Sequence, residues 1–196
     1  MTDKARALIA AAEKYVRTLF AANAGGHDAA HTLRVRRNAM RIAAETPGCD
    51  LLVVELAALL HDADDHKLFH TEDNANARAF LEDEGVDAET AVRVCAAINA
   101  VSFSQNRGKT PETPEGKIVQ DADRLDALGA VGVARCFAYG GEHGRPMEES
   151  VQHFYDKLLL LRDELNTPAA RRLAQPRHEF LEAFLKEYYA ETDAEP

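Results

Sequence analysis

The chain has 196 residues, a length that suits one domain with a sizeable core. Its 33 acidic residues outnumber its 23 basic residues, and the formal net charge of −10 argues against DNA or RNA polymers as partners. The three cysteines form no CxxC pair, the N-terminus lacks a signal-peptide pattern, and no apolar run approaches the roughly 18 residues that span a membrane. We therefore expect a cytoplasmic protein with reduced thiols and no membrane partner.

Apolar side chains recur at helical spacing along most of the chain, and abundant Ala and Leu favour helices over strands. Stop signals such as Thr46-Pro47-Gly48 separate these segments. The predicted helices span residues 3–22, 28–45, 50–64, 73–84, 87–101, 115–139, 148–165 and 168–190. The run LLVVELAALL is apolar nearly all round, which indicates a buried central helix. The pattern predicts an all-α, single-domain fold of about seven to nine helices.

Three features of the second half depend on loop composition, glycine or proline. Residues 102–116 have the composition of a loop, and a loop of that length in a compact domain is usually functional or mobile. Gly129 and Gly132 are expected in the middle of the helix over 115–139, as packing glycines. The last helix is expected to break or kink at Pro176.

Three stretches concentrate side chains that bind metals or phosphates. The first, HDAAHTLR, carries His27, His31 and Arg34, which share one helix face if the helix begins early enough. Arg34 is expected either to clamp a phosphate or to pair with an acidic neighbour. His27 is expected to orient a ligand, contact the substrate or cap the helix.

The second stretch, HDADDHK, follows the apolar run directly. Because residues three and four apart share a helix face, Asp65 is predicted to lie over both His61 and Asp62. His61 and Asp62 are about 100° apart around a helix axis, yet adjacent side chains at a helix end can converge on one ion. His66 and Lys67 complete this stretch.

The third stretch, QDADRLDALGA, carries three aspartates and one arginine. Asp123 and Asp126 share a helix face, whereas Asp121 points elsewhere. Two imidazoles and two carboxylates from the three stretches would form a mixed nitrogen and oxygen donor set. We expect a divalent metal ion, with manganese preferred and nickel, iron, cobalt, zinc or magnesium as alternatives. Such an ion lowers the pKa of bound water and polarises a phosphoryl oxygen.

The order of His31, of His61-Asp62 and of a later aspartate in ADRLD resembles the H…HD…D signature of the HD-domain metal-dependent phosphohydrolases. The longer stretches HDAAHTLRV, AALLHDADDHK and VQDADRLDALGAVGVARCFAYGG are similar to a bacterial subfamily of HD-domain nucleoside triphosphate pyrophosphohydrolases. The similarity runs from about residue 27 through HFYDKLLLLRDELNT to the tail. It implies a single HD-fold helical bundle over 1–196, with a core at about 27–165 and C-terminal helices over 168–190.

The resemblance also implies a ligand set and a catalytic group. One metal ion would be held by His31, His61, Asp62 and Asp123. The match of ADRL to the distal motif of the family favours Asp123 over its neighbouring aspartates. Asp65 occupies a place that is acidic in many catalytic members, which predicts that it accepts a proton from water.

The expected substrate is a nucleotide or another small phosphorylated compound. Side chains near the proposed ligands are predicted to contact its phosphates: Arg34, Lys67, His66, Arg124 and His27. We predict hydrolysis of nucleoside or deoxynucleoside triphosphates to monophosphate and pyrophosphate. The alternatives are a 5′-nucleotidase or phosphodiesterase on the same site, and a metal- or nucleotide-binding module without turnover. The oligomeric state stays open.

Overall fold

The computed structural model describes residues 2–22, 28–66, 68–106 and 108–192. These ranges contain helices and no strand, so the prediction of an all-α fold is confirmed. The helices are α1 (Asp3–Leu19), α2 (Ala29–Ala43), α3 (Leu51–Leu60), α4 (Ala75–Asp83), α5 (Ala88–Asn99), α6 (Phe103–Asn106), α7 (Pro114–Asp126), α8 (Gly129–Glu142), α9 (Met147–Asp156) and α10 (Pro168–Thr192), with a 3-10 turn at Leu158–Leu160. No helix in the described part is long and apolar enough to cross a membrane.

Many of the helices begin where the sequence provides a capping side chain. Five of them follow a Thr or Asp whose side chain accepts a hydrogen bond from a backbone N–H of the first turn. These residues are Thr2, Asp28, Asp50, Asp87 and Thr113. The cap of α2 fixes where that helix starts, and with it the direction of the side chains in its first turn.

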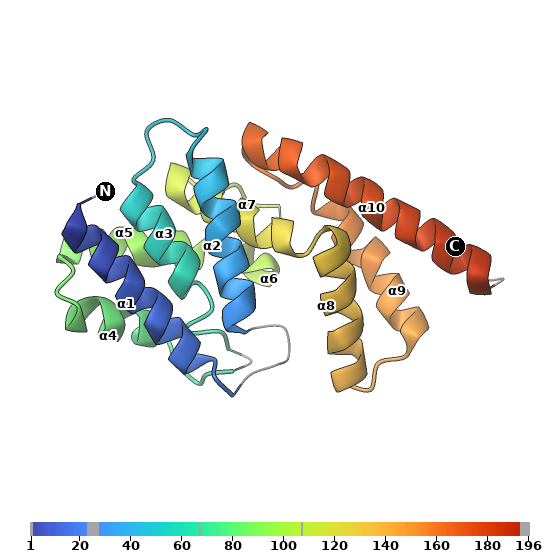
Figure 1. Ribbon diagram of the computed structural model, residues 1–196, viewed down its shortest axis with the longest axis horizontal. Coiled ribbons are helices and arrows are strands. Elements are labelled where there is room, and N and C mark those ends of the chain that lie inside the picture. Colours follow the sequence, from blue (N-terminus) through green and yellow to red (C-terminus); the bar gives the residue numbers. More distant parts are fainter. Residues whose placement is uncertain (1, 23–27, 67, 107, 193–196) are drawn as a thin grey trace.

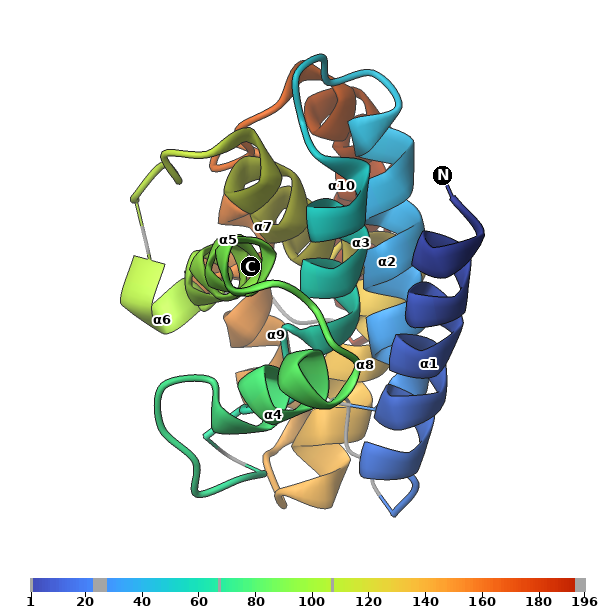
Figure 2. The ribbon, with the colours of Figure 1, turned by 90° about the vertical axis from the view of Figure 1, so that its left-hand side faces the viewer.

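Helix α3 lies in the middle of the group formed by α1, α2, α5 and α7 (Figures 1 and 2). All of its residues from Val53 onward are buried, and it packs against α1, α2, α5 and α7. The prediction of a buried central helix is therefore confirmed. The helix ends at Leu60 rather than at residue 64 as predicted, and turns replace it from His61 to Asp64.

The single helix predicted over 115–139 is wrong, because the chain breaks between α7 and α8. Helix α7 ends at Asp126, Leu128 is extended, and Gly129 has a φ of +70°. Figure 1 shows α8 turning away from α7 after this break. A Cβ atom on Gly132 would lie 2.2 Å from the carbonyl oxygen of Ala127, so the turn also needs glycine there. Gly129 is thus a turn glycine with a left-handed conformation, and not a mid-helix residue.

Other segments differ from the sequence-based expectations in detail. The predicted loop over 102–116 contains the short helix α6. The helix predicted over 148–165 is divided into α9, the 3-10 turn and a further turn. Helix α10 runs unbroken through Pro176, so of the two predicted possibilities the break is wrong and the kink stays a prediction.

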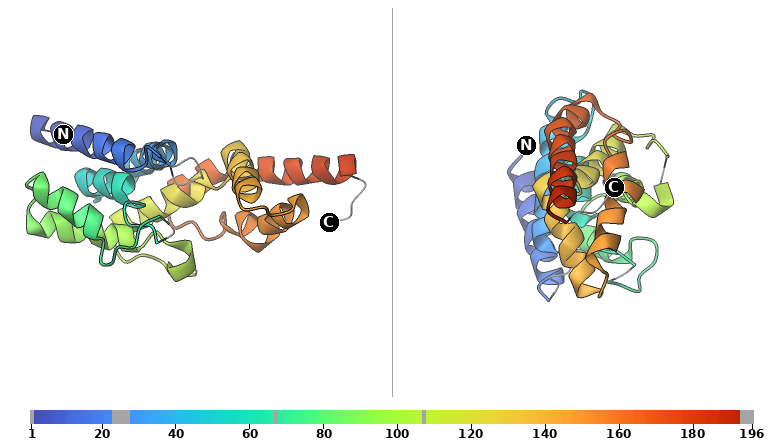
Figure 3. Two further views of the ribbon diagram at one scale, coloured as in Figure 1. Left: turned by 90° about the horizontal axis from the view of Figure 1, so that it is seen from below. Right: turned by 90° about the vertical axis from the view of Figure 1, so that its right-hand side faces the viewer.

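The C-terminal helices extend away from the group formed by α1–α5 and α7 (Figures 1 and 3). Helix α10 contacts α2, α7 and α8. Aromatic rings join α8, α9 and α10. The ring centroid of Phe137 in α8 lies 6.0 Å from that of Phe154 in α9 and 5.7 Å from that of Phe184 in α10. The assignment of one domain over 1–196 stays a prediction.

Replacing Gly129 with Ala should destabilise the fold. A Cβ atom would be strained at the positive φ and would lie 3.1 Å from Cβ of Arg177 on α10. We expect the free energy of unfolding in urea to fall by about 1–3 kcal/mol. Gly141→Ala is the matched control, because a Cβ atom there meets nothing within 4 Å inside the same helix. It should be neutral or stabilising by up to about 1 kcal/mol. Equal losses in both variants would contradict this account of the turn.

Candidate metal centre

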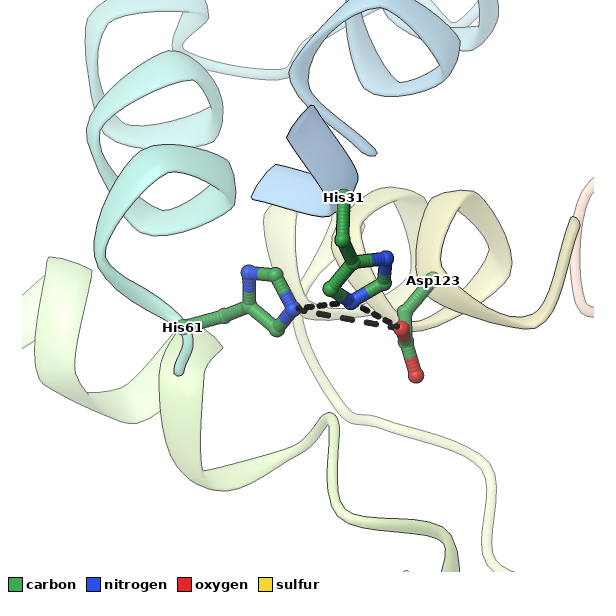
Figure 4. Close-up of side chains that lie close together, drawn as sticks. All are labelled: His31, His61 and Asp123. Atoms are coloured by element: carbon green, nitrogen blue, oxygen red, sulfur yellow. Dashed lines mark hydrogen bonds and ion pairs between the residues drawn. The ribbon is translucent and has the colours of Figure 1, made fainter. Parts of the chain in front are cut away.

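Three separate segments bring their ligand-type side chains to one point (Figure 4). His31 lies in the first turn of α2, where its backbone N–H donates to the capping carboxylate of Asp28 over 2.6 Å. His61 follows the last residue of α3, and Asp123 lies near the end of α7. The packing of α2 against both α3 and α7 makes this meeting possible.

The distances among these side chains are short. The Nε2 atoms of His31 and His61 are 3.3 Å apart. Oδ1 of Asp123 lies 3.4 Å from Nε2 of His31 and 3.9 Å from Nε2 of His61. Asp62 approaches both rings. Its Oδ2 lies 3.4 Å from Nε2 of His31, and its Oδ1 lies 3.4 Å from Nε2 of His61.

Hydrogen bonds on the opposite side of each ring determine which nitrogen carries the proton. Nδ1 of His61 lies 3.0 Å from the carbonyl oxygen of Ala58, which can only accept. Nδ1 of His31 lies 2.7 Å from Oδ2 of Asp126. Both contacts favour the tautomer with a proton on Nδ1, which leaves Nε2 as the nitrogen that can bind a metal ion. Nε2 of His31, Nε2 of His61 and a carboxylate oxygen of Asp123 all lie within 4.8 Å of one another, an arrangement that could hold a metal ion.

The electrostatics of the site follow from this arrangement. Burial opposes a charge on His31, but hydrogen bonds to Asp123, Asp126 and Asp62 raise its pKa well above the usual value. Burial likewise opposes charge on Asp123, yet its contact with His31 lowers the pKa of this carboxyl group. The cluster therefore binds positive charge strongly, either as a proton or as a metal ion.

The donor set fits a divalent metal ion. Ligands bound at about 2.1 Å lie roughly 3.0 to 3.4 Å apart when they are neighbours around an octahedral or tetrahedral ion. The separations of 3.3 to 3.4 Å between His31 and its three neighbours match this spacing. The histidine side chains are 1% exposed, whereas that of Asp123 is 28% exposed, so the site opens to solvent beside Asp123.

Asp126 stands behind His31 rather than among the converging atoms. Its carboxylate accepts hydrogen bonds from Arg34 at 2.7 and 3.0 Å and from Arg135 at 2.8 Å, besides the contact with His31. These partners lower the pKa of Asp126, although burial opposes this. Arg34 thus has the acidic neighbour that was one of its two predicted roles, and its contact with a phosphate stays a prediction.

Asp121 is also occupied elsewhere. Its carboxylate accepts hydrogen bonds at 2.8 Å from Asn166 and from the backbone N–H and hydroxyl of Thr167. It thereby fixes the segment that leads into α10. With Asp121 and Asp126 engaged in this way, the geometry favours Asp123 as the aspartate of α7 that faces the histidines.

The turn after α3 is held by a residue whose role the sequence did not indicate. Asp64 accepts hydrogen bonds from the backbone N–H groups of Asn76 and Ala77, at 2.9 and 3.0 Å, and so caps the start of α4. The side chain of Asn76 returns a bond of 2.8 Å to the carbonyl oxygen of Ala63. No local pattern reveals this role, because the partners lie 12 and 13 residues away.

The prediction that Asp65 shares a helix face with His61 and Asp62 is wrong, because α3 ends before His61. Asp65 is half-buried in the following turn, and its backbone N–H donates to the carbonyl oxygen of Asp62 over 3.1 Å. Its proton-accepting role stays a prediction.

The other predicted phosphate contacts are dispersed. Arg124 is buried, and its guanidinium donates to the carbonyl oxygen of Glu164 and lies 3.3 Å from the carboxylate of the same residue. This placement favours a structural role over contact with a substrate. His66 is exposed in the turn after Asp65. His27 and Lys67 lie outside the described residues.

Comparisons with known proteins agree with the fold and the site. The family model described as HD domain matches residues 28–128, which is more than half of the chain. The chain belongs to the HD-domain family. It is 41% identical over 182 residues to the Bacillus subtilis protein YpgQ, and the match covers 88% of each chain.

Solved structures of HD-domain relatives superpose over nearly the whole chain. The crystal structure of B. subtilis YpgQ in complex with ADP has a TM-score of 0.81 at 34% identity and covers 96% of both chains. A HD-superfamily hydrolase from Bacillus thuringiensis has a TM-score of 0.78 at 36% identity, covering 97% of this chain and 100% of that one. The HD fold and an enzyme of the HD-domain hydrolase class, both predicted from the sequence, are confirmed.

Replacing Asp126 with Asn should weaken metal binding without removing it. The amide keeps the shape of the carboxylate but cannot hold His31 and two arginines with a negative charge. Loss of such an outer partner typically costs 10- to 100-fold in metal affinity. We expect a loss of about that size in the Kd for Mn²⁺, measured by calorimetry.

Asp163→Asn is the matched control, since its side chain is 72% exposed and pairs only with Arg162 among the described residues. It should leave the Kd unchanged. Complete loss of the ion in Asp126→Asn would instead make Asp126 a direct ligand.

Proposed function

We propose that this HD-domain protein is a divalent-metal-dependent phosphohydrolase that cleaves nucleoside or deoxynucleoside triphosphates to monophosphate and pyrophosphate. The meeting of Nε2 of His31, Nε2 of His61 and a carboxylate oxygen of Asp123, with Asp62 close to both rings, supports the proposal most directly. His31, His61, Asp62 and Asp123 would hold the ion, and manganese is the ion that we propose for this mixed donor set.

The ion, when bound, supplies polarisation of a phosphoryl oxygen and a lowered pKa of water. The protein's own contribution is to fix the ligands before the substrate arrives. Asp126 and the carbonyl oxygen of Ala58 hold the two rings in one orientation. The exposed edge at Asp123 provides the side from which a phosphate can approach.

Asp65 is the proposed proton acceptor. Its backbone is fixed next to the HD pair, because its N–H donates to Asp62 and its carbonyl oxygen accepts from Leu68 and Phe69 at 2.9 and 2.8 Å. From this backbone position, the carboxylate of Asp65 is the group that we propose takes a proton from an attacking water molecule.

Two observations support a nucleotide substrate. The relative YpgQ, which matches over most of the chain, has been crystallised in complex with ADP. The stretches around the HD pair and after Asp121 are similar to the pyrophosphohydrolase subfamily. The fold alone does not select the substrate, because the same site serves many phosphate reactions.

Asp65→Asn should keep the metal and lose most of the turnover. General acid–base help is typically worth about 10² to 10⁴ in rate, so kcat should fall within that range. The Kd for Mn²⁺, measured in parallel, should stay close to that of the parent protein. Asp83→Asn on the exposed face of α4 is the control and should keep full activity. Parental turnover in Asp65→Asn would remove Asp65 from the mechanism.

Phosphorus NMR of a nucleotide panel tests the reaction itself. With added Mn²⁺, triphosphates should give monophosphate and pyrophosphate in equal amounts, because water cleaves the phosphoanhydride bridge between the α and β phosphorus atoms. His61→Ala protein prepared in the same way controls for contaminating enzymes. Release of inorganic phosphate alone, or turnover of monophosphates only, would indicate the nucleotidase alternative. The absence of turnover with every metal would favour the binding module.

A further inference from the structure

A cluster of arginines surrounds a cavity behind the metal centre. The cavity encloses about 270 Å³ and lies where α2, the start of α8 and α10 meet. Arg34, Arg37 and Arg41 line it from α2, and Arg177 lines it from α10. Among the described residues, the only carboxylate in its lining is that of Asp126. So much positive charge is unusual in a chain whose formal net charge is −10.

The negative charge of Asp126 is already balanced. It accepts two hydrogen bonds from Arg34 and one from Arg135, and it also contacts His31. Among the described residues, neither Arg37 nor Arg41 has a hydrogen bond or an ion pair. The cavity therefore has an excess of guanidinium groups over the acidic groups that face it.

Arg177 shows the consequence of this crowding. Its guanidinium donates to the carbonyl oxygen of Leu125 at 2.6 Å and to Oδ1 of Asn38 at 3.1 Å, both uncharged acceptors. Burial lowers the pKa of Arg177, and the positive charge of Arg41 lowers it further, although Asp126 opposes this. An anion in the cavity would relieve the repulsion between these two arginines.

A second groove shows how this chain balances arginines where no ligand is needed. That groove shares Arg37 and Arg41 with the first cavity and is also lined by Arg36. Arg36 is paired there with Glu55 at 2.6 and 2.8 Å and with Glu13 at 3.0 Å. Equivalent acidic partners for Arg37 and Arg41 are absent from the described residues.

We propose that this arginine pocket, formed by Arg34, Arg37, Arg41 and Arg177, binds a small phosphate-class oxyanion such as inorganic phosphate or pyrophosphate. Guanidinium groups are suited to such ligands, because their planar donors match phosphate oxygens in pairs. Gly129 and Ala130, the first residues of α8, line the same cavity, and Leu128 at the N-cap position makes no side-chain cap hydrogen bond in the described structure. The volume is just below the roughly 300 to 1,000 Å³ of typical small-molecule sites, which favours an anion over a whole nucleotide.

The pocket is separate from the metal centre. Asp126 lies between them and contacts Nδ1 of His31, whereas the metal-facing atom of that ring is Nε2 on its opposite side. Binding of the anion therefore needs neither the metal ion nor hydrolysis. It can be measured even if the proposed reaction proves wrong.

Calorimetry with pyrophosphate and metal-free protein tests the pocket. The parent protein should bind one pyrophosphate per chain, and the affinity should fall with added salt. The double variant Arg37→Ala/Arg41→Ala should bind at least about tenfold more weakly, which corresponds to about 1.4 kcal/mol. Both side chains are exposed, so the variant should fold, which circular dichroism can verify.

Arg6→Ala/Arg17→Ala is the matched control, because it removes two exposed positive charges from α1 instead. It should bind pyrophosphate like the parent protein, as should Asp123→Ala. Parallel titrations with inorganic phosphate and ADP distinguish the source of the phosphate group: equal affinity for pyrophosphate and ADP would mean that only the diphosphate is recognised. No saturable binding, equal losses in both double variants, or loss in Asp123→Ala would overturn the proposal.

Discussion

The structure depends on one electrostatic constraint, which is that the Nε2 atoms of two buried histidines face each other at 3.3 Å with two carboxylates alongside. Like-signed lone pairs and anionic oxygens repel one another in a buried site unless a cation lies between them. The fold maintains this arrangement by packing α2 against α3 and α7. The caps at Asp28 and Asp64 then fix the backbone on either side of it, at the start of α2 and after α3.

Behind the histidines, Asp126 links this centre to the rest of the molecule. Its carboxylate joins His31 of α2 to Arg34 of the same helix and to Arg135 of α8. The turn at Gly129 makes the last of these contacts possible, because it directs α8 away from the end of α7. The metal centre and the arginine pocket therefore lie on opposite sides of one buried carboxylate.

Much of the fold was predictable from local patterns. The helical spacing and the stop signals predicted most helix positions, and the apolar run of α3 indicated its burial. The end of α3 at Leu60 was not predictable, because Asp64 makes its decisive contacts with α4, which follows later in the chain. Similarly, glycine permits both close packing and a positive φ, so the sequence could not reveal which of these Gly129 provides. The partners of Asp126 on α2 lie 92 and 95 residues away, which hides its role from any local motif.

Pulsed electron paramagnetic resonance of Mn²⁺ added to the protein tests the central constraint most directly. If the two Nε2 atoms hold one ion, the spectrum should show coupling to two imidazole nitrogens, with one ion per chain. His31→Ala should lose one of these couplings or the ion itself. A spectrum with water and carboxylate ligands only, and no imidazole coupling, would contradict the account, because the histidines would then face each other for another reason.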